Sequence, residues 1–191
     1  AIAKIKKQGL VSVAPLNDYV AAISVGIEKN GELVLDLNYE EDSKAQMDMT
    51  LDVMAHSLVY WVQDVYKRKL LKKGSRLYGM TSSGGSKIWA TYGAVSAAKA
   101  AMESHLRQFA FELGKEGITA NAIMAGVTHT PALEKIPGFK NMIYEADRRN
   151  PSGRKTTVQD VADAIVALAD DRTHWLNGNI LGVDGGEYIV Q

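Results

Sequence analysis

The chain has 191 residues, of which 46% are hydrophobic and 23% are charged, and this composition is typical of a globular protein and argues against disorder. The 22 basic and 22 acidic side chains cancel, so the net charge gives no reason to expect binding to nucleic acid or to an anionic membrane. The absence of cysteine excludes disulfides, thiolate metal sites and cysteine nucleophiles. No apolar run is long enough to cross a membrane and no signal peptide is visible, so we expect a cytoplasmic protein.

The beginning of the chain shows a helical pattern followed by extended ones. The pattern of residues 1–9, with Gly9 as a stop signal, is typical of the end of a helix. Two runs rich in β-branched residues, 19–27 and 33–39, flank the dipeptide Asn30-Gly31, which is a strong short-range hairpin signal. We therefore expect a helix followed by an antiparallel hairpin.

The rest of the chain, from residue 50 onward, alternates helical and extended patterns. Apolar residues recur at helical spacing in two stretches, and Thr157 and Asp160 are typical of a capping box that begins a third helix. This alternation predicts an α/β protein with a parallel sheet flanked by helices, in which ligands bind at the carboxyl ends of the strands. In chain order we expect a helix over 51–70, a strand over 75–83, a helix over 94–114, a strand over 117–126, a helix ending at Leu168 and a strand over 178–187.

Tyr92 and Lys99 are seven residues apart at the beginning of the longest predicted helix. Seven residues come to within about 20° of two full helical turns, so the two side chains are expected on one face. A neighbouring cation favours the tyrosinate and can lower the pKa of a phenol by roughly 1–3 units, which makes it a usable proton donor. In isolation such a pair is ordinarily a half-buried aromatic residue and a solvated lysine. Here the pair follows a strand that ends at Ser82 and Ser83 and precedes "ITANAIMAGVTHTPAL", which favours a site.

With these motifs in this order, residues 50–191 resemble the C-terminal part of a short-chain dehydrogenase/reductase. The spacing of six residues between Tyr92 and Lys99 resembles the enoyl-acyl carrier protein reductase branch, whereas the usual family spacing has three. The resemblance implies a partial, doubly wound, Rossmann-like parallel sheet. It also implies NADH or NADPH as cofactor, an enoyl thioester or acyl-carrier-protein substrate of fatty acid synthesis, and a homo-oligomer.

The resemblance implies three catalytic residues. Tyr92 would donate to the enolate oxygen of the substrate. Lys99 would hold the ribose hydroxyls of the nicotinamide and tune Tyr92. Ser82 would be an orienting group where many family members carry a second tyrosine, with Ser83 as the alternative.

The resemblance also implies a cofactor-binding segment and a loop. The segment "AGVTHT" would cradle the nicotinamide, and residues 131–151 would form a mobile substrate-binding loop. The glycine-rich turn that begins the family fold is not found, because Gly9, Gly26 and Gly31 do not form it. We expect roughly the first half of the family fold to be missing. The implied cofactor-binding residues are Lys99, Gly126, Val127, Thr128 and Thr130.

Residues 1–49, with the motif "LDLNYEED", resemble an internal segment of ribonuclease PH. That resemblance implies that Asp36 and Asp42 can hold a divalent cation, although an acidic turn facing solvent is the alternative that we favour. The arginine motifs that would bind phosphate and RNA are not found, so nucleic acid is not expected as a partner. The junction predicts two segments, 1–49 and 50–191, in a chimera. The alternatives to a reductase are a phosphorolytic 3′ exoribonuclease remnant and an inactive chimera, and no other metal site is expected.

Overall fold

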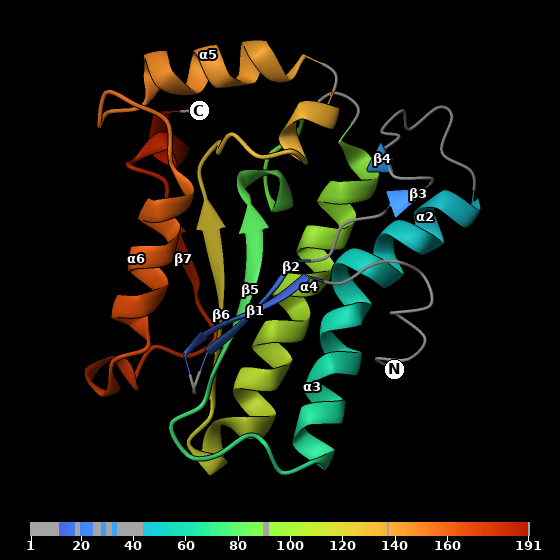
Figure 1. Cartoon of the computed structure of the whole chain (residues 1–191), viewed down its shortest axis with the longest axis vertical. Coiled ribbons are helices and arrows are strands. Elements are labelled where there is room, and N and C mark those ends of the chain that lie inside the picture. Colours follow the sequence, from blue (N-terminus) through green and yellow to red (C-terminus); the bar gives the residue numbers. More distant parts are fainter. Residues whose placement is uncertain are drawn as a thin grey trace.

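The computed structural model describes residues 12–17, 20–24, 28–29, 32–33, 44–89, 92–136 and 138–190 (Figure 1). Four short strands near the N-terminus form two antiparallel hairpins, and three later strands form one parallel sheet. The hairpin strands are β1 (Ser12–Asn17), β2 (Val20–Ser24), β3 (Glu28–Lys29) and β4 (Glu32–Leu33). The strands of the parallel sheet are β5 (Arg76–Ser82), β6 (Thr119–Ala125) and β7 (Ile180–Val183), hydrogen-bonded in that order.

A π-helical turn over Asp52–His56 joins the first two described helices. The helix predicted over 51–70 is therefore confirmed, but it belongs to a helical segment that begins earlier. Among the described residues, no helix is long and apolar enough to cross a membrane. The helices are α2 (Lys44–Leu51), α3 (Ser57–Lys67), α4 (Gly93–Leu113), α5 (Phe139–Arg149) and α6 (Val158–Leu168).

The two faces of β6 are covered by different helices, because successive side chains of a strand point to opposite sides. Ala120 and Ala122 belong to the core cluster formed with α3 and α4. Ile123 instead packs with Val161 and Ile165 of α6. Figure 1 shows the same arrangement, with α3 and α4 on one side of the sheet and α6 on the other. The predicted α/β fold with a partial, doubly wound, Rossmann-like sheet is confirmed.

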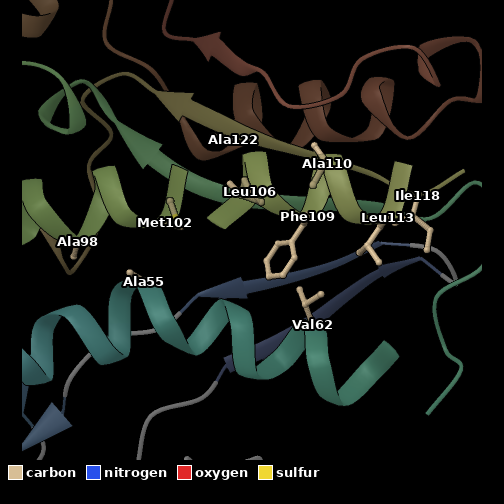
Figure 2. Packing of buried hydrophobic residues seen from close by; sticks show 11 residues of the cluster. Ala55, Val62, Ala98, Met102, Leu106, Phe109, Ala110, Leu113, Ile118 and Ala122 are labelled. Atoms are coloured by element: carbon tan, nitrogen blue, oxygen red, sulfur yellow. The ribbon is translucent and has the colours of Figure 1, made fainter. Parts of the chain in front are cut away.

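The helix α4 forms the centre of the larger core (Figure 2). Ala98 and Ala55 have no exposed surface, and their small side chains let α4 approach the π-helical turn closely. Further along α4, Phe109 is directed toward Val62 of α3 (Figure 2). Full burial of a side chain such as Leu106 contributes roughly 1.5–3 kcal/mol. This packing fixes the orientation of α4, and with it the position of its first turns beside the sheet.

A hairpin around Asn30-Gly31 is confirmed only in part, since β3 pairs antiparallel with β4 over two residues on each side, with Lys29 opposite Glu32. The run 19–27 was wrong as its first strand, because β2 within that run pairs with β1 instead. The hairpin of β1 and β2 was not predicted from the sequence. It contains Pro15, a residue that sheets accept only at edges or irregularities, and its register shifts between Pro15 and Asn17. The helix predicted over 1–9 lies outside the described residues.

The segment 131–151 is not a loop throughout, because it contains the helix α5. Glu145 accepts from Arg148 and Arg149, which are three and four residues further along the chain. Side chains at these spacings meet on one face of a helix, and such ion pairs stabilise it modestly. The expectation of a loop over this whole segment was therefore wrong.

Candidate functional site

The carboxyl ends of β5 and β6 meet at one end of the sheet, where α5 lies across them (Figure 1). They border a cavity of about 440 Å³, a volume within the range of small-molecule sites. All of the predicted catalytic and cofactor-binding residues lie around this one cavity. Its polar and backbone lining includes Ser82, Ser83, Tyr92, Lys99, Gly126, Val127, Thr128 and Thr130, and its apolar lining includes Met54, Trp89, Val95, Leu133, Ile136 and Met142.

Tyr92 is the N-cap residue of α4, with φ −108° and ψ 10°, so it precedes the helical face on which it was predicted. Its hydroxyl oxygen lies 3.3 Å from Oγ of Ser82 at the end of β5. Its ring packs so closely against Gly84 that a Cβ atom there would overlap the ring. Ser83 lines the cavity, but Ser82 is the serine that meets the phenol.

Burial, and not Lys99, sets the protonation of Tyr92. Burial raises the pKa of the phenol above its ordinary value, and the hydrogen bond with Ser82 offsets this only in part. The expectation that Lys99 lowers this pKa was wrong, because the ammonium donates to the main-chain carbonyl of Met80. Tyr92 is therefore a neutral hydrogen-bond donor at neutral pH.

Lys99 directs its Nζ to the Met80 carbonyl oxygen over 2.7 Å. The residue as a whole retains intermediate exposure, but its ammonium group is surrounded by protein, and the surroundings of the charged atom govern its protonation. Burial lowers the pKa of Lys99 from 10.5 to about 8, and the charge of Glu103 acts in the opposite direction. The ammonium is thus still mostly protonated at pH 7. Of its three N–H donors, the Met80 carbonyl takes one.

Glu103 is a buried carboxylate behind Lys99 that was not predicted from the sequence. Its Oε1 accepts a hydrogen bond from Oγ1 of Thr81 over 2.5 Å. A Cβ atom at Gly85 would lie 2.6 Å from the same oxygen, so the glycine makes room for the carboxylate. The sequence did carry a signal for this residue, because a glutamate inside the apolar stripe of a helix is costly to bury without partners.

The Gly126–Val127 backbone passes over a second buried carboxylate. The amide of Val127 donates to Oε2 of Glu187 over 3.0 Å, and Glu187 is only 3% exposed. A Cβ atom at Gly126 would overlap Oγ1 of Thr156 and lie 2.7 Å from Oε2 of Glu187. Only glycine therefore lets the backbone take this path without displacing its neighbours. Glu187 was not predicted either, because the sequence indicated only that it ends the strand expected over 178–187.

The two threonines of this segment make local hydrogen bonds. Oγ1 of Thr128 donates to the Gly126 carbonyl over 2.9 Å. Oγ1 of Thr130 accepts from the amide of Leu133 over 3.2 Å and so orders the beginning of the next turn. These bonds hold the segment in a compact form along the wall of the cavity.

Asp36 and Asp42 lie outside the described residues, so the structure does not describe the weak alternative metal site. Within the part of the chain that the structure describes, no three or more His, Asp or Glu side chains come together as a metal site would require.

The fold and this site define a class of protein, an α/β protein with a tyrosine–lysine pair at the carboxyl end of its parallel sheet. Residues 18–187 match the family described as "Enoyl-(Acyl carrier protein) reductase", and the chain belongs to this family. The match begins before the predicted junction at residue 49. The comparisons give no support to the ribonuclease PH resemblance or to a chimera.

Relatives with known names agree with this assignment. The NADH-dependent enoyl-acyl carrier protein reductase of Buchnera aphidicola is 34% identical over 140 residues, which cover 73% of this chain and 53% of that protein. Its counterpart from Aquifex aeolicus is 29% identical over 150 residues, which cover 78% and 55%. The crystal structure of the Bacillus cereus enoyl-acyl carrier protein reductase with NADP+ and indole naphthyridinone has a TM-score of 0.76 at 28% identity, covering 82% of this chain and 61% of that one. The chain spans about half the length of the relatives that it matches by sequence.

Proposed function

We propose that the cavity at the carboxyl end of the sheet reduces an enoyl thioester with NADH or NADPH, as in fatty acid synthesis. The observation that carries this proposal is the convergence of the Ser82–Tyr92 hydrogen bond and the buried ammonium of Lys99 on one cavity. The names of the relatives support the reaction class, since they are enoyl-acyl carrier protein reductases.

The residues around the cavity fit the nicotinamide end of such a cofactor. The Lys99 ammonium has donors beyond the one that Met80 accepts, and these suit ribose hydroxyls. Gly126 and the segment that follows it line the cavity, and the lack of a side chain at Gly126 lets this backbone pass close to Thr156 and Glu187. When bound, the reduced nicotinamide supplies a hydride to the β-carbon of the substrate.

The residues of the chain have separate tasks in this proposal. Tyr92 holds its proton at neutral pH and donates a hydrogen bond to the thioester carbonyl oxygen as negative charge develops there. Ser82 orients the phenol through the 3.3 Å contact with its hydroxyl. The positive charge of Lys99 stabilises the developing anion and holds the ribose. Apolar residues such as Trp89 and Leu133 exclude water from the substrate.

The extent of the reductase unit, its substrate and its oligomeric state are part of the same proposal. We take residues 50–191 as the reductase unit, with an enoyl group carried by acyl-carrier-protein as its substrate. We also propose a homo-oligomer that assembles through α4, where Phe111 is 81% exposed on the outer side of the helix.

The test measures the binding of NADH and NADPH to the purified chain, followed by loss of reduced-nicotinamide absorbance with a crotonyl thioester. Tyr92→Phe should lower turnover at least ~10²-fold, because it removes a positioned proton donor. Tyr66→Phe is the matched control, since Tyr66 is 43% exposed on α3 and bonds to Glu116 away from the cavity. Equal turnover in the wild type and Tyr92→Phe would reject the role of the phenol. A folded chain that binds neither cofactor would reject the proposed function of the chain on its own.

A further inference from the structure

A second cavity, of about 720 Å³, lies at the opposite end of the sheet from the Tyr92–Lys99 site. It is bordered by the amino ends of β5 and β6, by the turn that follows α4, and by the connection from α6 to β7. In a parallel sheet this end is not the usual place for a substrate, so its polar lining needs its own explanation. Its lining includes Lys73, Arg76, Thr119, Asp171 and His174.

The central feature of this cavity is the guanidinium group of Arg76. Arg76 is only 7% exposed, although arginine is almost never this buried without a partner. Its Nη1 donates to the carbonyl oxygen of Gly74 over 2.6 Å. Its Nε and Nη2 are both buried and have no hydrogen-bond partner among the described residues. These two nitrogens form one edge of the planar guanidinium, the fork that pairs with two oxygens of a carboxylate or phosphate.

A second unpaired group lines the same cavity. Oγ1 of Thr119 is buried without a partner among the residues that the structure describes, and Thr119 is only 6% exposed. Buried polar atoms are nearly always hydrogen-bonded, because an unmade bond costs the full desolvation of the group. Thr119 lies directly opposite Arg76 in the parallel pairing of β5 and β6. Two residues with unsatisfied polar atoms therefore lie side by side on adjacent strands at this cavity.

The charges around the cavity favour an anion as this partner. Arg76 and Lys73 contribute two positive charges to its lining, and Asp171 contributes one negative charge. Within the described part of the chain, Arg76 has no carboxylate within ion-pair distance. His174 lines the same cavity and adds a ring that can donate a hydrogen bond.

We propose that this cavity binds a small oxyanion, a phosphate or carboxylate group, whose oxygens accept from Nε and Nη2 of Arg76 and from Oγ1 of Thr119. Such a ligand satisfies all three orphaned atoms at once and neutralises a buried charge. The site is separate from the proposed reductase chemistry and does not depend on it.

The test is the thermal stability of the full chain in Tris chloride at constant ionic strength, titrated with inorganic phosphate and separately with acetate. Binding to the folded state alone should raise the Tm along a saturating curve, by roughly 5–10 °C at 100 times the Kd. The anion with the lower Kd shows whether phosphate or carboxylate is the better ligand. Without either anion, Arg76→Met should be at least as stable as the wild type, because it removes an unpaired buried charge.

Substitutions at Arg76 distinguish the contribution of its bidentate Nε–Nη2 edge from that of its positive charge. Arg76→Met should lose the saturating rise, and Arg76→Lys should weaken binding at least ~10-fold, because it keeps the charge but not the bidentate edge. Thr119→Val preserves shape and should weaken binding roughly 2- to 10-fold, which keeps the test decisive if the Arg76 variants do not fold. Arg107→Met is the matched control, since Arg107 is exposed on α4, and it should bind like the wild type. An equal rise in Arg76→Met, or no saturating rise in the wild type with either anion, would overturn the proposal.

Discussion

The buried ammonium of Lys99 predicts an unusual dependence of stability on pH. The pKa of Lys99 is about 8 in the folded chain and 10.5 as its ordinary value. Between these two values the unfolded chain binds more protons than the folded one, so stability rises with pH. One pKa unit corresponds to about 1.4 kcal/mol, so burial of the charge costs about 3 kcal/mol at neutral pH. Over the range from pH 7 to pH 9.5, Lys99 should add about 2 kcal/mol to the free energy of unfolding.

The assay is urea unfolding of the wild type and of Lys99→Met at pH 7 and at pH 9.5. The quantity to compare is the change in the free energy of unfolding between the two pH values, since other lysines titrate in both proteins. We expect the wild type to gain about 2 kcal/mol more than Lys99→Met over this range. Lys140→Met is the control, because Lys140 is exposed on α5, and it should behave like the wild type. The pKa of Tyr92 is raised, which keeps its titration out of the window. Parallel changes in the wild type and Lys99→Met would refute the burial of the ammonium.

Three further predictions concern single residues. Gly126→Ala should lower the free energy of unfolding by about 1–3 kcal/mol and weaken NADH binding, since its Cβ would overlap Oγ1 of Thr156. Gly182→Ala should change neither, because its Cβ would meet nothing closer than 3.7 Å. Burial, and to a smaller extent the nearby His56, lower the pKa of His105 below its ordinary value of 6.5. The free energy of unfolding should therefore fall as the pH drops below about 6.5. Urea unfolding at pH 7 and pH 5 should show a smaller fall for His105→Gln than for the wild type. Thr157→Ala should cost about 1 kcal/mol in urea unfolding by removing the capping box of α6, whereas Thr157→Ser should not; equal stability of the two variants would contradict the role of the cap.

The elements of the parallel sheet were predictable from the sequence because their signals are local. The apolar stripe of α4 has helical spacing, and Thr157 begins α6 with a side chain that caps its own helix. The elements that were missed or wrongly assigned are those in which one feature of the sequence argued against the structure that formed. The hairpin β1–β2 contains Pro15, and α5 lies in a segment whose resemblance implied a loop.

The candidate site was likewise predictable only in part: the residues that form it were predicted, but their protonation states were not. The spacing of Tyr92 and Lys99, and the rule that ligands bind at the carboxyl ends of parallel strands, predicted that both residues belong to one site, although Tyr92 is the N-cap residue of α4 and not part of its helical face. Their protonation did not follow, because a pKa depends on how deeply a group is enclosed and on where its hydrogen bonds go. The ammonium of Lys99 donates to Met80 on β5, a residue far from it in the chain. No spacing along one helix could reveal this contact.

The sequence by itself determined the helices and strands that surround the parallel sheet apart from α5, the family resemblance of residues 50–191, and the residue types available for chemistry. Only the tertiary structure decided which polar groups meet. It placed Glu103 against Thr81 and Glu187 under Val127, and it left one edge of Arg76 buried without a partner among the described residues. The physical reason is that burial and hydrogen bonding are properties of packed surfaces, and these surfaces form between residues that are distant in the chain.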